Sequence, residues 1–213
     1  MPTTKTTPDQ LLDLFQAQGG LLTARAARQA GLPSMAITRL LEKGLIERIQ
    51  RGVYRLTDES ELPTADLEAL DLLEVQLRSP YARPCLVSAL HLHGLSTTRP
   101  AALQLAIPRH RHRPRIETPQ TEFFFFGPRA YGTGLTTLDV RGQALVTYSP
   151  EKTLTDLLRY APKFGRELYL EGLKKYLGRR AVPLYRLTEA ARDAGVWTAM
   201  SRDLEVLLHD QDH

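Results

Sequence analysis

The chain has 213 residues, of which 42% are hydrophobic and 24% charged, a composition typical of a globular protein with one large domain or two modest ones. Its single cysteine, Cys85, excludes a disulfide framework within the chain. The sequence has no basic-then-apolar leader, and no apolar run approaches the roughly 18 residues of a membrane-spanning helix. We therefore expect a cytoplasmic protein with no membrane partner.

The charged residues are unevenly distributed. Residues 1–56 carry eight Lys/Arg and four Asp/Glu, residues 57–77 carry seven Asp/Glu and no Lys/Arg, and residues 78–213 carry twenty Lys/Arg and thirteen Asp/Glu. The acidic stretch separates two basic parts, and phosphate would repel it. The sequence predicts a DNA-binding domain over residues 1–57, an acidic linker and connecting helix over 58–80, and a C-terminal domain over 81–213.

Residues 7–56 have the pattern of a winged helix-turn-helix. A core-facing helix begins at Thr7-Pro8 and ends before a diglycine, and Thr23 can cap a short second helix. Gly31-Leu32-Pro33 favours a turn, because glycine tolerates left-handed backbone and proline cannot continue a helix. A third helix over residues 35–43, capped by Ser34, places an apolar stripe toward the core. That stripe consists of Ile37, Leu40 and Leu41.

The opposite face of the third helix suits a major groove, because it mixes small, polar and basic side chains. This groove-facing set is Ser34, Met35, Thr38, Arg39 and Lys43. Two alternating strands over 45–49 and 53–56, joined by a turn, predict the wing. Its candidate phosphate contacts are Arg48, Arg51 and Arg55. The alternative is a winged helix that contacts only protein.

The remaining chain predicts a larger mixed domain. A helix capped by Thr64 reaches residue 78, and Ser88 caps a short helix over 89–93. Apolar runs predict strands over 103–107, 122–126, 135–140 and 144–148, and the aromatic run Phe123–Phe126 predicts a strand covered on both faces. Four helices follow, over 151–160, 165–177, 184–194 and 196–208. The predicted fold class is α+β, with a C-terminal domain of a mixed or antiparallel sheet and helices.

Two basic clusters lie in the C-terminal domain. One has an arginine at every odd position, so an extended chain would place the four on one face, where they could contact DNA, RNA or an acidic partner. These residues are Arg109, Arg111, Arg113 and Arg115. The alternative is a solvated loop. For the second cluster we favour an ordinary solvated helix face; its residues are Lys163, Arg166, Lys174, Lys175, Arg179 and Arg180.

No motif indicates a metal, a cofactor or catalysis. His91 and His93 fall on a predicted helix, where a spacing of two points the rings apart, and no further ligands accompany His110 and His112. Glu151 and Asp156, near a lysine, resemble the acids of a metal-dependent nuclease, but helix capping and ion pairing explain them more simply. The sequence predicts a protein that is not an enzyme.

The motifs together resemble a known family. Residues 20–56, GLLTARAARQAGLPSMAITRLLEKGLIERIQRGVYRL, are followed by VSALHLHGL at 87–95 and SPEKTLTDLL at 149–158. This order resembles the AbiEi antitoxins of bacterial abortive-infection toxin–antitoxin systems over roughly residues 8–208. The row from Arg109 to Arg115 is not a hallmark of that family.

The resemblance implies a type IV antitoxin with two roles in phage defence. The N-terminal domain would bind inverted repeats in double-stranded DNA of its own promoter and repress transcription, through the groove-facing set and the wing arginines. The C-terminal domain would take part both in repression and in countering a nucleotidyltransferase-like toxin, with no stable complex required. Two alternatives remain: a stand-alone winged-helix transcription regulator whose C-terminal domain senses a ligand or partner, and a nucleic-acid-processing enzyme.

Overall fold

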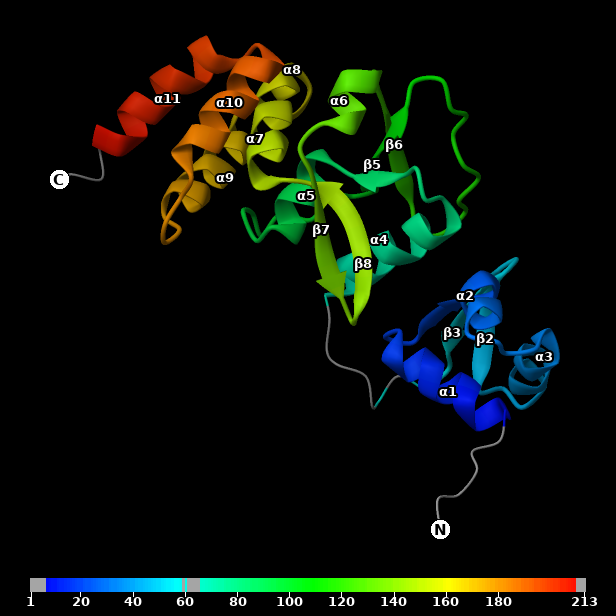
Figure 1. Ribbon diagram of the computed structural model, residues 1–213. Helices are drawn as coiled ribbons and strands as arrows, with labels where there is room; N and C mark the ends of the chain where they lie inside the picture. Colours follow the sequence, from blue (N-terminus) through cyan, green and yellow to red (C-terminus); the bar gives the residue numbers. More distant parts are fainter. Residues whose placement is uncertain (1–6, 59, 61–65, 210–213) are drawn as a thin grey trace. The chain divides into compact units, whose positions relative to one another are not determined.

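The computed structural model of the chain describes residues 7–58, 60 and 66–209. The chain forms two compact units (Figure 1). The first contains residues 1–80 and 138–145, and the second contains residues 81–137 and 146–213. Each unit is described by itself.

The first unit has the order of elements of a winged helix-turn-helix. Its elements are α1 (Thr7–Ala17), β1 (Leu21–Thr23), α2 (Ala24–Gln29), α3 (Ser34–Glu42), β2 (Ile46–Gln50), β3 (Val53–Leu56) and α4 (Leu67–Arg78). The three strands form an antiparallel sheet in the order β1-β3-β2. α1, α2 and α3 cover its core, which includes Leu11, Phe15, Leu22, Ile37 and Leu40. The predicted helices and wing are therefore present in the predicted order.

α4 begins later than the sequence pattern suggests. Its cap is Asp66, whose side chain accepts a hydrogen bond of 2.8 Å from the N–H of Glu68. The predicted cap, Thr64, lies outside the described residues, as does part of the predicted acidic linker. An aspartate at this position satisfies an N–H of the first turn that has no partner within the helix.

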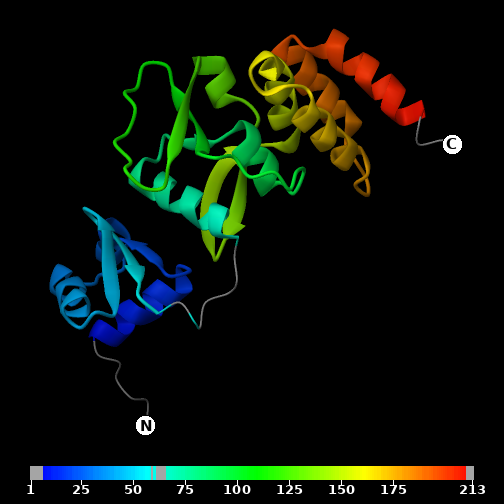
Figure 2. The same ribbon diagram turned by 180° about the vertical axis from the view of Figure 1, so that it is seen from behind.

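The second unit contains a small mixed sheet and a helical bundle (Figure 2). Its elements are β4 (Arg83–Pro84), α5 (Leu86–Leu92), β5 (Leu103–Pro108), β6 (Thr121–Phe126), α6 (Pro128–Gly132), β7 (Leu135–Val140), β8 (Gln143–Tyr148), α7 (Pro150–Arg159), α8 (Ala161–Phe164), α9 (Glu167–Leu177), α10 (Leu184–Ala194) and α11 (Trp197–His209). β4 pairs antiparallel with β5, and β5 pairs parallel with β6. β7 and β8 form a separate pair, of which residues 138–145 belong to the first unit.

The prediction that Ser88 caps a helix was wrong. α5 already begins at Leu86, and the hydroxyl of Ser88 instead accepts the N–H of Gln104, at 3.0 Å. The side-chain oxygen of Gln104 in turn accepts the N–H of Val87, at 2.9 Å. A side chain from β5, distant in sequence, therefore satisfies a free N–H at the start of α5.

The prediction that the aromatic strand is covered on both faces was also wrong. Along β6, Phe124 and Phe126 are buried, whereas Phe125 is 37% exposed. The strand therefore alternates between a buried and an open face. Phe124 packs edge-on against Tyr160, with ring centroids 5.6 Å apart.

The helices of the second unit pack around α7. Ser149 caps α7, with its hydroxyl accepting the N–H of Lys152, and α5, α9 and α10 pack against this helix. α10 also packs against α11 (Figure 1). The core contains Leu90, Leu154, Tyr169, Leu173 and Leu187.

These elements confirm the α+β fold class, with a helical N-terminal module that contains a helix-turn-helix and a larger mixed C-terminal part. Among the described residues, no helix combines the length and the apolar character needed to cross a bilayer.

Candidate nucleic-acid interface

Local interactions hold the helix-turn-helix together. Thr23 has extended backbone, and its hydroxyl accepts the N–H of Ala26 at 3.0 Å, so it caps α2 as predicted. Gly31 has a φ of +76°, which an L side chain rarely adopts, and the N–H of Leu32 then returns to the carbonyl of Ala27. The N-cap of α3 is Pro33 rather than Ser34, because Ser34 is already the first helical residue.

α3 has one buried face and one exposed face. Ala36, Ile37 and Leu40 are at most 5% exposed and pack into the core. All five residues of the groove-facing set are exposed: Ser34, Met35, Thr38, Arg39 and Lys43. Met35 is 65% exposed, an unusual position for a large apolar side chain on a small module. The side of α3 turned away from the core is therefore open to a partner.

The residue types on this face match the chemistry of base edges. An arginine can donate two hydrogen bonds to the major-groove edge of guanine, a threonine hydroxyl can donate or accept, and an apolar side chain can contact a thymine methyl group. Arg39, Thr38 and Met35 offer these groups on neighbouring turns of one short helix. Lys43, at the C-cap, adds a positive charge for the phosphate backbone.

The wing separates its three arginines. Arg48 pairs across the hairpin with Tyr54, and Glu47 pairs with Arg55, so Arg48 and Arg55 lie on opposite faces of the strands. The guanidinium of Arg55 lies 2.5 Å from the carboxylate of Glu47. Arg51 lies in the exposed turn between the strands. Arg55 is therefore held by a carboxylate, whereas Arg51 lies at the tip of the wing.

The segment from Arg109 to Arg115 is a turn followed by coil, so it does not form the single row expected of an extended strand. The turn is closed by a hydrogen bond from the N–H of Arg111 to the carbonyl of Pro108. The guanidinium of Arg111 then lies 5.2 Å from the ring centre of Tyr81, and that of Arg113 lies 5.4 Å from the ring centre of Phe125.

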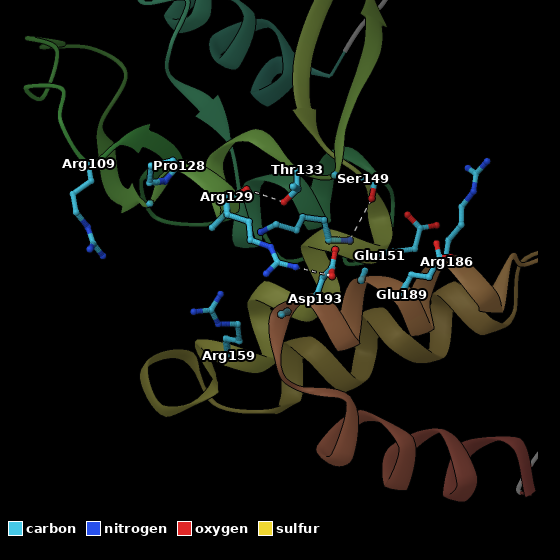
Figure 3. Close-up of a pocket in the computed structure, with 16 residues that line it drawn as sticks. Arg109, Pro128, Arg129, Thr133, Ser149, Glu151, Arg159, Arg186, Glu189 and Asp193 are labelled. Carbon is cyan, nitrogen blue, oxygen red and sulfur yellow. Dashed lines mark hydrogen bonds and ion pairs between the residues drawn. The ribbon is translucent and has the colours of Figure 1, made fainter.

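The two ends of this segment differ in their surroundings. Arg115 is 91% exposed and lies 3.5 Å from Glu117. Arg109, by contrast, lines a cavity of about 580 Å³ in the second unit (Figure 3). The four arginines therefore have distinct environments, and this weakens the prediction that all four share one role.

The other singled-out residues have structural partners. Lys152 forms a buried ion pair with Asp156, and Glu151 accepts a hydrogen bond from the hydroxyl of Tyr176 at 2.8 Å. Burial raises the pKa of Asp156, and Lys152 opposes that shift. Within the described parts of the chain, no group of three or more His, Cys, Asp or Glu could hold a metal ion. The ion pair accounts for the charges of Lys152 and Asp156, and the hydrogen bond from Tyr176 satisfies Glu151.

Of the two histidines predicted to lie on one helix, the first does so and the second is at the end of that helix. His91 is on α5, and His93 is its C-cap, with Nε2 2.6 Å from the carbonyl of Tyr148. Burial lowers the pKa of His93. His110 and His112 are exposed in the turn and coil after β5.

The second basic cluster is largely an ion-paired surface. Lys163 contacts Glu122 at 2.6 Å, Arg166 contacts Asp203 at 2.6 Å and Lys175 contacts Glu171 at 2.8 Å. The guanidinium of Arg179 donates a hydrogen bond to the carbonyl of His93. These contacts favour the interpretation as an ordinary helix face.

Sequence reasoning missed the cavity. Its lining arginines, Arg109, Arg129, Arg159 and Arg186, come from four separated segments, so no spacing marks them as a group. Only the helix start at Ser149-Pro150, which lies beside it, carries a local signal.

One of the comparisons with known proteins, a family model, matches the N-terminal module. No curated protein matches the chain. A crystal structure of the Rv2827c protein from Mycobacterium tuberculosis is similar at 17% sequence identity and a TM-score of 0.49, covering 96% of this chain and 81% of that one. The family model described as a transcriptional regulator, AbiEi antitoxin, matches residues 9–57, which confirms the resemblance for the N-terminal module of this chain.

Proposed function

We propose that this protein is a DNA-binding autorepressor that acts as the antitoxin of a type IV toxin–antitoxin system. The observation that supports the proposal most is the division of α3 into a buried face and an exposed face of Met35, Thr38, Arg39 and Lys43. The match of residues 9–57 to a family of transcriptional regulators supports the same use of this module. In this proposal, residues 1–57 are the DNA-binding domain.

α3 enters the major groove, where Arg39 contacts a base edge and Met35 contacts an apolar methyl group. Arg48 and Arg51 in the wing contact the phosphate backbone and fix the orientation of the module without reading sequence. Arg55 instead stabilises the wing, because Glu47 holds its guanidinium. Two modules on inverted repeats of the protein's own promoter would repress transcription.

DNA binding is tested with the full-length chain by fluorescence anisotropy, on its own upstream region and on a scrambled duplex. Arg39→Ala should weaken the binding free energy for the upstream region by about 1–3 kcal/mol, as expected for one lost bidentate base contact. Arg202→Ala removes an exposed arginine from α11 and is the matched control. Equal losses in the two variants, or equal affinity of the native chain for both duplexes, would contradict sequence-specific binding through α3.

The antitoxin role is tested separately. The chain should restore growth of cells that express a neighbouring nucleotidyltransferase-like toxin from an unrelated promoter. Because the proposed neutralisation belongs to residues 81–213, Arg39→Ala should lose repression and keep the rescue. Failure of the native chain to restore growth would leave a regulator that is not an antitoxin.

A stand-alone regulator with a sensing C-terminal domain is the second candidate. The cavity of about 580 Å³ in the second unit favours it, because ligand sites typically have volumes of about 300–1,000 Å³. A small molecule that changes the affinity for upstream DNA, together with no toxin gene beside this one, would favour this function over the first.

A further inference from the structure

The cavity in the second unit has an arrangement of charges that DNA binding by the first unit does not use. It lies among α6, the start of α7 and α10, with Arg109 at its edge (Figure 3). Its volume of about 580 Å³ falls within the usual range for small-molecule sites.

One end of the cavity is cationic. Arg109 and Arg159 lie at the same end (Figure 3), both are exposed, and neither pairs with a carboxylate among the described residues. Both guanidinium groups also act on the phenol of Tyr160: burial raises its pKa, and the two positive charges oppose that rise. Two guanidinium groups without a direct ion pair at one end of a cavity have the charge and hydrogen-bond donors to bind a phosphate group.

The nearby acids form their direct ion pairs with other residues, although the charge of Arg159, like that of Lys152, opposes the rise that burial causes in the pKa of Asp156. Asp156, the acid on the same helix as Arg159, is buried and paired with Lys152. Asp193 is paired with Arg129, at 2.8 Å, across the cavity between α10 and α6. A phosphate at this end would therefore not compete with an existing ion pair of Arg109 or Arg159.

The other end of the cavity offers hydrogen-bond acceptors. Glu151 and Glu189 lie there beside Arg186 (Figure 3). Glu189 is exposed and pairs with no cation in the part of the chain that the structure describes. Carboxylates at this end suit amino or hydroxyl groups of a ligand, because an ionised carboxylate only accepts hydrogen bonds.

Small apolar side chains also line the cavity, beside the Arg129–Asp193 ion pair. Ala130 comes from α6, and Ala190 and Ala194 come from α10. Walls built from alanine leave room for a flat ring and offer it an apolar surface. The cavity thus combines an arginine end suited to an anion, apolar walls, and an end where carboxylates can accept hydrogen bonds.

We propose that this cavity binds a nucleoside phosphate, with its phosphate at Arg109 and Arg159, its ring against the alanines and its amino or hydroxyl groups toward Glu189. The start of α7 contributes little to holding the phosphate, because the hydroxyl of Ser149 already accepts the N–H of Lys152. The inference does not rest on DNA binding by the first unit.

The test is isothermal titration calorimetry of the full-length chain with AMP, GMP, CMP and UMP, and with adenosine and inorganic phosphate as partial ligands. At least one of the four nucleotides should bind at one site per chain, and more tightly than phosphate or adenosine. Arg109→Gln and Arg159→Gln should each weaken that binding about tenfold or more, as expected for a lost charged hydrogen bond.

Arg115→Gln is the matched control, because it removes the same charge from the same segment as Arg109 but lies outside the cavity lining. Its affinity for the nucleotide should stay within about twofold of that of the native chain, as expected for the loss of an exposed surface charge. No binding of any of the four nucleotides, binding of phosphate as tight as that of a nucleotide, or an equal loss in Arg115→Gln would overturn the proposal. Anisotropy with upstream DNA, measured on Arg159→Gln, should be unchanged, which separates this test from that of the proposed function.

Discussion

Replacing Arg51 with alanine removes a positive charge from the tip of the wing without disturbing the core, because this residue lies in the exposed turn. We expect affinity for the upstream region and for unrelated DNA to fall alike, since a phosphate contact carries no sequence information. With Arg39 assigned to a base edge and Arg55 held by Glu47, the proposal assigns three exposed cations of α3 and the wing to phosphate. They are Lys43, Arg48 and Arg51.

The salt dependence of binding gives this prediction a magnitude. Each neutralised phosphate of duplex DNA contributes about −0.9 to the slope of log K against log salt concentration. Three contacts give about −2.7 for one module and about −5.4 for two modules on inverted repeats. Arg51→Ala should reduce these slopes to about −1.8 and −3.6.

The assay is fluorescence anisotropy of the full-length chain between about 50 and 200 mM salt, a range over which such contacts change affinity measurably. Arg39→Ala is the contrasting variant, because it should narrow the difference between upstream and unrelated DNA. A slope that Arg51→Ala leaves unchanged would refute the assignment of the wing tip to phosphate. A slope near zero for the native chain would refute electrostatic binding of DNA by this surface.

Three further predictions concern the folded state. Burial lowers the pKa of His93 below that of the unfolded chain, so its contribution to stability is complete above about pH 6.5 and is lost as the pH falls. The free energy of unfolding should then decrease by at most about 1.4 kcal/mol per pH unit. Thermal unfolding between pH 7.5 and 5.5 should show this decrease, and His93→Gln should reduce it. Burial also raises the pKa of the Cys85 thiol, so a thiol-specific reagent should modify it only upon unfolding, and rapid modification of the native chain would contradict that burial. Leu40→Ala should destabilise the winged module by about 2–5 kcal/mol in denaturant unfolding, because Leu40 is fully buried. Met35→Ala, at an exposed position, should change stability by less than about 0.5 kcal/mol, and equal effects of the two would contradict the assigned faces of α3.

The winged module was predictable because its signals are local. The cap at Thr23, the left-handed turn at Gly31 and the apolar spacing of α3 each act over a few residues and point to the same structure. Only small shifts remained, such as the start of α3 at Ser34, since a helix boundary depends on one residue's backbone angles.

The second unit was less predictable because its decisive contacts join distant segments. Serine before a helical pattern usually indicates a cap, yet the hydroxyl of Ser88 binds the N–H of Gln104, and the side chain of Gln104 satisfies the N–H of Val87. The parallel pairing of β5 with β6 likewise depends on a long connection, which no periodicity in either strand reveals. The exposure of Phe125 was unpredictable for the same reason, because the residue pattern of a strand does not show which elements cover each of its faces.

Charge patterns in the sequence overestimate the surface available for anions, because they ignore the carboxylates that folding brings close. Arg55 is one of the wing arginines and Lys163 belongs to the second basic cluster, yet Glu47 holds the first and Glu122 the second. Arg159 belongs to neither set, but it forms no direct ion pair with a carboxylate among the described residues and lies at the cationic end of the cavity. Because a guanidinium group that the protein's own acids leave uncompensated keeps its full attraction for phosphate, pairing in the fold is a better guide to function than density along the chain. By this criterion, Arg51 on the wing and Arg109 at the cavity are the residues whose replacement should most weaken phosphate binding in their respective units.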